Sequence, residues 1–376
     1  MNFRERFIAS LDFSKPDKIS FIPGGPREST LRRWRSEGLG ENQDYMEALC
    51  SIIGIEYKKP DTSKYISVSF AMNPIFEEKI LKHEEGHYIV QDWMGAIVEI
   101  SDTYDLSYLR AAKDFVTRKW HKFPVETRND WYEMKKRYDP YDPVRLPQNF
   151  DELAIANKNR TWLQSLSFHG PFWQLREWCG FEGLCMLMIE DPDFVEEMAE
   201  FWKGFVLVVM ERFFEKATCD HILISEDMAY KEKSMISPQM AKKFLAPCWE
   251  SWSEKARQNG CKLIEIDSDG YIGELIPVWI ESGVNVCSPI EIAAGNNLIE
   301  YRKKFGKNMA YRGGVDKRAI AKGGKALEEA MSFIPFLLED GGYIPSCDHG
   351  VPPDISWGNF IEYGRILAKM TGWLKN

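Results

Sequence analysis

The sequence predicts a single (β/α)8 TIM barrel over residues 1–376, with an N-terminal extension and an inserted antiparallel meander. Three observations support this α/β fold class. Beyond residue 160, apolar segments of strand length alternate with segments of helical periodicity. Most of these apolar segments end in polar side chains or glycine. Two more apolar segments near the N-terminus bring the strand candidates to eight, the number that closes such a barrel.

Composition and charge narrow the functional classes. The chain has 376 residues, of which 44% are hydrophobic, enough for one barrel with an insertion. Its net charge of −9 arises from acidic and basic residues mixed throughout, which argues against nucleic acid as a partner. The apolar run 205–210 is far too short to span a bilayer, and the charged N-terminus lacks a signal-peptide core. We therefore expect a soluble, cytoplasmic protein without membrane contact. The oligomeric state is open, with a homodimer as one option.

The N-terminal part of the chain supplies the extension and two strand candidates. Phe3 to Leu11 has the pattern of a short amphipathic helix. The first strand candidate is 19–22, which ends at a run of prolines and glycines. A helical pattern covers 27–34, and the second strand candidate is 66–70.

Residues 75–115 have a different pattern, which predicts the inserted meander. Two apolar segments flank His83-Glu84-Glu85-Gly86, a hairpin signature. A third antiparallel strand is expected at 96–100. We expect this insertion to cover or extend the mouth of the barrel. The polar connection 131–151 that follows is rich in proline turns and predicts no regular element.

The remaining six strands are expected in regular succession, separated by helices. They are 162–168, 220–224, 262–266, 284–287, 308–311 and 343–345. Proline at the first helical position predicts helices that begin at Pro192 and Pro238, the second of them running to about Gln258. Further helical patterns cover 326–338 and 357–373. Because the strands would be parallel, their polar ends should meet at one edge.

The strand at 262–266 ends in Asp267-Ser268-Asp269-Gly270, the stretch that carries the most chemistry. Two carboxylates at positions i and i+2 of a loop can bind one cation, or share one proton if they are packed closely. A turn with a helix cap is the alternative interpretation of this tetrapeptide. Other strand ends carry Asp227, Glu291, Arg312 and His349. This recurrence favours a functional site.

Taken as a set, the strand-end motifs resemble a known family. They are Glu226-Asp227-Met228, Ser237-Pro238, Asp269-Gly270, Gly283-Val284-Asn285, Ser288-Pro289-Ile290-Glu291, Gly313-Gly314-Val315-Asp316-Lys317 and Asp348-His349-Gly350. Their order resembles that of the uroporphyrinogen decarboxylase superfamily. That superfamily contains haem-pathway decarboxylases and cobalamin-dependent methyltransferases, and the resemblance implies a single barrel.

Two regions distinguish the branches of that superfamily. The arginine-rich segment that decarboxylases use to hold substrate carboxylates is not matched by 25–30. The chain looks more like the methylcobamide:coenzyme M methyltransferase branch, whose Pro-x-Cys matches Pro345-Ser346-Cys347. The His-x-Cys of that branch is replaced here by Asp267-Ser268-Asp269. The resemblance therefore implies a zinc site with a changed ligand set.

The resemblance assigns roles to particular residues. A zinc ion would be held by Asp267, Asp269, Cys347 and His349. The alternative is a metal-free acid–base cluster of Asp267, Asp269 and His349, and the two remain open. Asp227 joins the catalytic candidates, and the substrate contacts are Trp173, Glu291 and Arg312.

Three functions follow from these roles. The first is corrinoid-dependent methyl transfer between a methylated corrinoid protein, as partner, and a small acceptor or donor. The second is a carboxy-lyase acting on a carboxylate substrate without metal. The third is a corrinoid-binding subunit that has lost catalysis.

Overall fold

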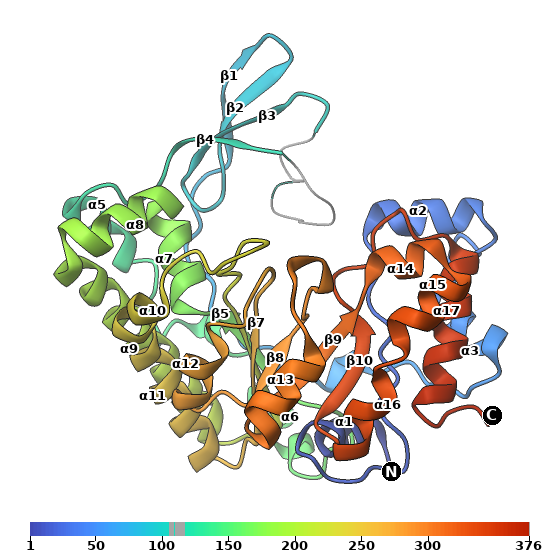
Figure 1. Ribbon diagram of the computed structural model, residues 1–376. Coiled ribbons are helices and arrows are strands. Elements are labelled where there is room, and N and C mark those ends of the chain that lie inside the picture. The colour runs from blue at the N-terminus through green and yellow to red at the C-terminus, as the bar shows by residue number, and fades with distance from the viewer. Residues whose placement is uncertain (105–108, 110–116, 376) are drawn as a thin grey trace.

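A six-stranded parallel sheet forms the centre of the computed structural model, which describes residues 1–104, 109 and 117–375 (Figure 1). The strands follow chain order across the sheet. They are β5 (Ser165–His169), β6 (His221–Ser225), β7 (Leu263–Asp267), β8 (Val286–Ser288), β9 (Ala310–Val315) and β10 (Tyr343–Cys347). Each of the last six predicted strands is therefore present, close to its predicted position. Their carboxyl ends share one edge, as parallel pairing requires.

The two N-terminal strand candidates, 19–22 and 66–70, are not strands. Both nevertheless run close to the ends of the sheet. The amide of Cys347 in β10 donates to the carbonyl of Pro23 at 3.2 Å, and the ring of Phe70 packs on that of Phe168 in β5 at 4.8 Å. Residues 66–70 bind other partners, since the amide of Ile66 donates to the side chain of Gln164. Closure of the predicted barrel is therefore not confirmed.

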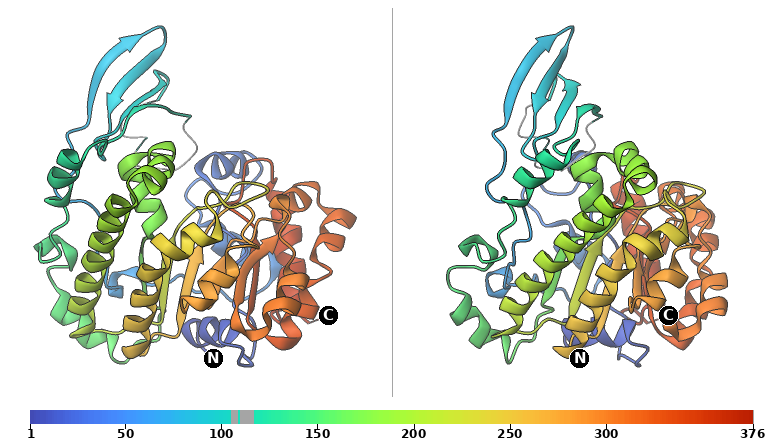
Figure 2. Two further views of the ribbon diagram at one scale, coloured as in Figure 1. Left: turned by 60° about the vertical axis from the view of Figure 1, so that its left-hand side comes forward. Right: turned by 90° about the vertical axis from the view of Figure 1, so that its left-hand side faces the viewer.

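Helices cover the outer face of the parallel sheet (Figure 2). They are α2 (Glu28–Ser36), α3 (Tyr45–Ile53), α5 (Arg128–Lys135), α6 (Phe150–Asn157), α7 (Pro171–Cys179), α8 (Phe181–Glu190), α9 (Pro192–Phe214), α10 (Pro238–Phe244), α11 (Ala246–Gln258), α12 (Ile276–Glu281), α13 (Leu298–Phe305), α14 (Lys317–Lys322), α15 (Gly324–Met331), α16 (Ile334–Asp340) and α17 (Trp357–Met370). The apolar side chains of the outer face pack against them and form the main core.

Two helix predictions needed correction. The helix expected from Pro238 to Gln258 is divided at Leu245, because Pro247 in the first turn of α11 lacks an amide hydrogen to continue α10. The region 131–151, expected to hold no regular element, contains most of α5 and a short 3-10 helix at Pro143–Arg145. A capping box formed by Thr127 and Asp130 starts α5.

The amino-terminal end of the parallel sheet is closed by α1 (Phe3–Leu11), at the predicted bounds. Phe7 and Leu11 of this helix pack against inward-facing side chains of four strands. Those side chains are Leu263, Val286, Ala310 and Ile344. They form an apolar floor below the inner face of the sheet. This floor closes the amino-terminal end of the inner face to ligands.

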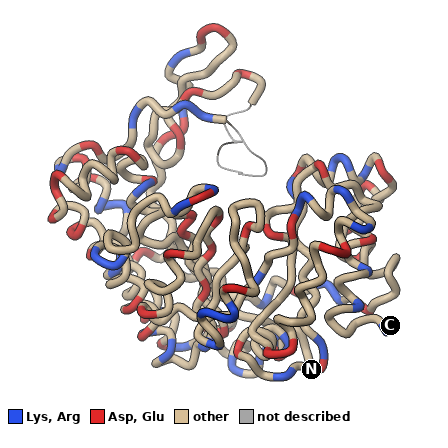
Figure 3. Tube along the Cα trace, in the orientation of Figure 1, with Lys and Arg blue, Asp and Glu red and all other residues tan. Residues whose placement is uncertain are grey.

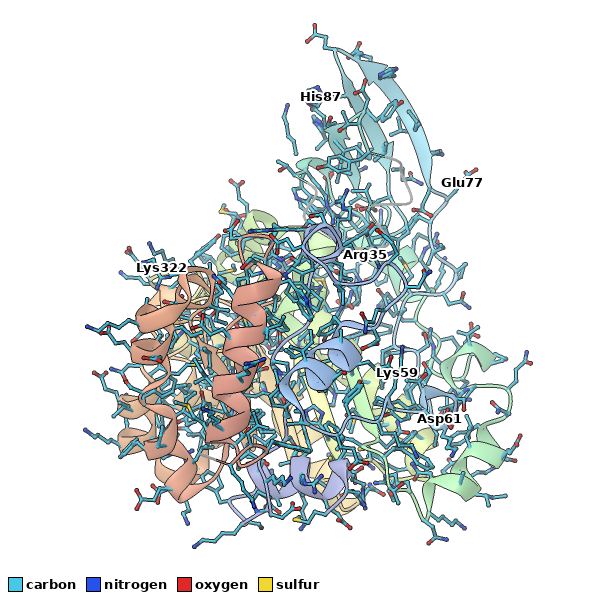
Figure 4. The ribbon with its side chains drawn as sticks, turned by 90° about the vertical axis from the view of Figure 1, so that its right-hand side faces the viewer. Arg35, Lys59, Asp61, Glu77, His87 and Lys322 are labelled. Carbon is cyan, nitrogen blue, oxygen red and sulfur yellow. The ribbon has the colours of Figure 1, made fainter. Side chains whose placement is uncertain are left out.

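The predicted meander is present and projects beyond the carboxyl ends of the parallel strands (Figure 1). It is an antiparallel sheet of β1 (Lys79–Glu84), β2 (His87–Gln91), β3 (Ile97–Ser101) and β4 (Lys119–Lys122). Glu85 and Gly86 form the hairpin turn with φ of 48° and 80°. The strand β4 extends the insertion beyond the predicted limit of 115, and 105–108 and 110–115 lie outside the described residues. His87 lies near the far end of the insertion (Figure 4).

The distribution of charge and the apolar character of the helices can be compared with the predictions made from the sequence. Acidic and basic residues are interspersed along the trace (Figure 3). No helix in the described part of the chain combines the length and apolar character needed to cross a membrane.

Candidate active site

A buried charged network occupies the inner face of the sheet, one layer above the apolar floor. Glu265 of β7 is 0% exposed and accepts hydrogen bonds from the Nε and Nη2 atoms of Arg312 at 3.0 and 2.5 Å. His221 Nε2 lies 2.9 Å from the other Glu265 oxygen. Burial alone would raise the pKa of Glu265, but Arg312 and His221 outweigh it and hold this pKa below its ordinary value. Arg312, predicted as a substrate contact, is thus paired within the protein.

Asp267 lies two residues further along β7, nearer the carboxyl edge, on the same side of the strand as Glu265. Its Oδ2 atom is 3.4 Å from the hydroxyl of Ser288. Burial raises the pKa of Asp267 to about 6, assisted by the charges of Glu265 and Asp269 and opposed by Arg312. Asp267 can therefore hold or release a proton close to neutral pH.

Asp269 and His349 form a hydrogen-bonded pair at the rim, as the sequence grouping predicted. The Nε2 atom of His349 lies 2.9 Å from Oδ2 of Asp269. The Nδ1 atom of His349 lies 3.2 Å from Nη2 of Arg27. A guanidinium only donates, so Nδ1 accepts in the contact with Arg27, whereas the carbonyl oxygen of Gly350, 3.4 Å from the same atom, needs Nδ1 to donate. The hydrogen bond to Asp269 raises the pKa of His349 despite its burial.

Two further acidic candidates, Asp227 and Glu291, have cationic partners. Asp227 Oδ2 lies 3.1 Å from Nη2 of Arg176. Burial raises the pKa of Asp227, and the charges of Asp269 and Glu291 add to the effect against Arg176. Glu291 accepts from the amide of Gly270 at 3.0 Å and pairs with Lys317 Nζ at 2.5 Å. Both carboxylates therefore lie near the loop that carries Asp269, and Glu291 binds this loop through the amide of Gly270.

A cavity of about 500 Å³ adjoins this cluster. It lies at the carboxyl ends of β5 and β6 and is bounded by α7, the segment 67–72 and residues of the insertion. Ser225, which lines the cavity, is the register partner of Asp267 on the neighbouring strand. The volume is that of a small-molecule site. The cavity and the acid–base cluster are therefore neighbours across two strands.

Trp173, the predicted aromatic substrate contact, lies behind the cavity wall rather than in it. Its indole Nε1 donates to Oε1 of Glu177 at 2.7 Å, and Glu177 lines the cavity. Glu177 and the aromatic lining residues Tyr138 and Trp202 were not predicted as site residues from the sequence. Trp173 and Glu177 are four residues apart, so on a helix they lie side by side. With α7 placed directly after β5, this spacing would have put Glu177 at the carboxyl edge beside Trp173.

Cys347 is separated from the other predicted metal ligands. Side chains alternate along β10, so Cys347 shares its face with Tyr343, and both belong to the core between sheet and helices. Cys347 is 3% exposed, and burial raises the pKa of its thiol to about 12. Within residues 1–104, 109 and 117–375, no group of three or more His, Cys, Asp or Glu side chains is arranged to hold a metal.

The predicted zinc ligands therefore do not fit one ion in this arrangement. Zinc prefers a thiolate, and the Cys347 thiol is buried away from the rim. Both ring nitrogens of His349 already face partners, Asp269 and Arg27. We derive no chemical step through zinc. The metal-free alternative, an acid–base cluster, agrees with the contact between Asp269 and His349.

The fold and the site define an α/β protein with a ligand-sized cavity beside an acid–base cluster at the carboxyl edge of a parallel sheet. No protein-family model matches the sequence, and no curated protein matches it significantly. Among solved structures, the chain is similar to a methyltransferase from Methanosarcina mazei, with a TM-score of 0.53. The similarity covers 97% of this chain and 98% of that chain at 12% identity. At this identity the comparison shows a shared fold.

Proposed function

We propose that this chain is a methyltransferase that moves a methyl group between a small substrate in the cavity and a corrinoid carried by a partner protein. The observation that carries the proposal is the cavity of about 500 Å³ beside the buried carboxyl group of Asp267. The structural similarity to a methyltransferase over 97% of the chain supports the coarse activity. The resemblance of the strand-end motifs to the cobalamin-dependent branch supports the corrinoid.

The chemistry of methyl transfer explains why a carboxyl group is needed beside the cavity. When a methyl group leaves an oxygen, nitrogen or sulfur atom, that atom keeps the bonding electrons and takes up a proton. In the reverse direction, an acceptor loses a proton as it gains the methyl group. Asp267, with its pKa raised to about 6, is suited to exchange that proton. His349 and Asp269, at the rim, can pass it on to water.

The size of the cavity bears on how a corrinoid would be presented. A volume of about 500 Å³ suits a drug-sized molecule, whereas a corrinoid is much larger. A corrinoid would therefore stay on its partner protein and face the cavity opening. When bound there, it supplies a cobalt ion that gives or takes the methyl group. The side chains of this chain would hold the substrate and manage its proton.

The lining of the cavity favours methyl transfer over the carboxy-lyase alternative. A carboxylate substrate needs a cation to bind it. The lining includes no lysine or arginine among the residues that the structure describes. Arg312, the basic residue expected to meet an anion, is paired with Glu265. The lyase and the inactive corrinoid-binding subunit therefore remain outcomes of the experiment below.

The experiment is an anaerobic assay with free cobalamin. Purified protein is mixed with chemically reduced cobalamin and a panel of methylated amines, ethers and thioethers, and methylcobalamin is followed by its visible absorption. We expect formation of methylcobalamin with at least one donor. No conversion with any donor, or with thiol acceptors and methylcobalamin in the reverse direction, contradicts the proposal. Carbon dioxide released from carboxylic acids instead would favour the lyase.

The substitution Asp267→Asn tests the acid–base role. We expect the rate to fall about 100-fold to 10,000-fold, because an amide cannot exchange the proton. If Asp267 acts as the acid, the wild-type rate should fall as pH rises above about 6, and if it acts as the base, the rate should fall below about 6. The matched control is Asp193→Asn, an exposed aspartate of α9. An Asp267→Asn rate within threefold of wild type contradicts the role.

A further inference from the structure

The walls of the cavity indicate a class of substrate. We propose that the cavity binds a small methylated onium cation, such as a quaternary ammonium group. This inference rests on the proposed function, because it names the molecule whose methyl group would be transferred.

Among the described residues, six aromatic side chains line the cavity: Phe70, Trp93, Tyr138, Phe168, Trp178 and Trp202. All of them except Trp93 are buried, so they expose only a small part of each ring to the cavity. The rings of Tyr138, Trp178 and Trp202 contact one another edge to face, with centroids 5.5 to 5.9 Å apart. Onium groups bind to such sets of rings because the negative ring faces attract a cation.

The polar atoms of these rings are already used within the protein. Trp202 Nε1 donates to the carbonyl of His169 at 2.9 Å, and Trp178 Nε1 donates to the Tyr138 hydroxyl at 3.2 Å. Gln174 Nε2 also donates to that hydroxyl, at 3.2 Å. The indoles of Trp178 and Trp202 therefore have no N–H left for a ligand and can offer it only ring carbon. This part of the wall suits the methyl groups of a quaternary ammonium group, which neither donate nor accept a conventional hydrogen bond.

The charges near the cavity favour a cation over an anion. Glu177 lines the cavity, its side chain is 22% exposed, and its closest hydrogen-bond donor is the neutral indole of Trp173. His169 Nδ1 lies 3.4 Å from the other Glu177 oxygen. Among the described residues of the lining, Glu177 is the one acidic side chain and no lysine or arginine accompanies it, so the lining carries a negative charge that a cation can balance.

A neutral methyl ether of the same size is a weaker candidate. It would displace water from the Glu177 carboxylate without replacing the lost interaction, which costs free energy. A quaternary ammonium also suits methyl transfer. Its carbon–nitrogen bond breaks with both electrons going to nitrogen, the methyl group passes to the reduced corrinoid of the partner, and a neutral amine leaves. That amine can then take a proton from Asp267.

A pair of probes that differ only in charge tests the inference. Choline and 3,3-dimethyl-1-butanol have the same shape, and the second has carbon in place of the charged nitrogen. Binding to the wild-type protein is measured by calorimetry and by quenching of tryptophan fluorescence, without corrinoid. We expect choline to bind about tenfold more tightly than the alcohol. Equal affinity, tighter binding of the alcohol, or no binding of choline overturns the inference.

Two pairs of variants locate the binding. Glu177→Gln keeps an acceptor for Trp173 but removes the charge, and we expect it to weaken choline binding about tenfold without affecting the alcohol. Its control is Glu182→Gln, an exposed glutamate of α8. Trp93→Leu should also weaken choline binding, whereas Tyr132→Leu, at an exposed tyrosine of α5, should not. Near-ultraviolet circular dichroism checks that each variant is folded.

The result can be separated from that of the proposed function. Choline binding that is weakened by Glu177→Gln and Trp93→Leu, but not by their control variants, supports the inference even if no methyl transfer is found. Methyl transfer from an ether or a thioether, without choline binding, supports the proposed function and overturns the inference.

Discussion

The two halves of the carboxyl edge use their charges differently. In the half formed by β7 to β10, carboxylates are paired with cations of the protein, as Glu265 is with Arg312 and Glu291 with Lys317. In the half formed by β5 and β6, Asp227 has Arg176 as its partner, but Glu177 of the cavity lining accepts from the neutral indole of Trp173 at 2.7 Å, and its other oxygen lies 3.4 Å from Nδ1 of His169. Charges that are paired internally fix the strand ends. A carboxylate held by a neutral group keeps more of its charge for a ligand.

The difference between the two halves can be tested by substitutions, and the largest loss of stability is expected at Arg312. Replacing it by methionine leaves Glu265, which is 0% exposed, without its guanidinium partner and with His221 as its remaining basic neighbour. We expect Arg312→Met to lower the free energy of unfolding by about 3–5 kcal/mol, measured by urea denaturation at pH 7. Glu265→Gln should cost less, because the Arg312 side chain is 25% exposed and can still reach water.

The double variant provides the control. Once the carboxylate is removed, the loss of Arg312 should matter less, so Arg312→Met with Glu265→Gln should be more stable than the sum of the single effects indicates. A cost below about 1 kcal/mol for Arg312→Met would show that the pair does not fix this half of the edge.

A smaller effect is expected at Gly170, in the cavity half. A Cβ at Gly170 would lie 2.1 Å from the carboxylate of Glu226, which accepts from the amides of Phe172 and Trp173 and so fixes the start of α7. We expect Gly170→Ala to lower the free energy of unfolding by about 1–3 kcal/mol and to weaken choline binding, because α7 carries Glu177.

Gly183→Ala in α8 is the matched control. The nearest atom to a Cβ there is 3.9 Å away, and alanine favours a helix over glycine. Unfolding measurements should therefore show this variant to be as stable as wild type or slightly more stable. If Gly170→Ala is also as stable as wild type, the close packing of Glu226 under α7 does not contribute to stability.

The smallest effect concerns the proton of His349. Asp269 raises the pKa of His349 above 6.5, so this pair stabilises the fold below pH 6.5 and the stabilisation is lost as pH rises through the higher value. We expect it to contribute less than about 1 kcal/mol, because Asp269 is 38% exposed. In titrations followed by nuclear magnetic resonance, Asp269→Asn should lower the pKa of His349 and Arg27→Met should raise it. A pKa unchanged by Asp269→Asn would contradict the pairing.

The regular part of the fold could be predicted from local sequence. Strands such as 262–266 are apolar, short and bounded by polar ends, and Pro192 marks the start of α9, so local preference and final structure agree. The segments 19–22 and 66–70 were predicted as strands on the same grounds. Their backbone groups bind distant partners such as Gln164, and no local pattern contains that information.

The candidate site could also be predicted only in part. The proximity of Asp267, Asp269 and His349 followed from the rule that parallel strands end at one edge. The orientation of Cys347 was missed because a difference of one residue along β10 exchanges the inner face for the outer one. The cavity was missed because Tyr138, Trp178 and Trp93 come from a connection, a helix and an insertion that meet only in three dimensions.

The helix α1 has a consequence for how traffic reaches the site. Because Phe7 and Leu11 pack against the amino-terminal ends of the strands, apolar side chains close that end of the inner face. Substrate and product would then both pass the carboxyl edge, where the cavity lies, and a partner that docks there would control the order in which they pass. Deleting α1 would expose Leu263 and Val286 and admit water beneath the Glu265–Arg312 pair. A change at the amino-terminal end of the sheet would therefore affect the charged network nearer the carboxyl edge.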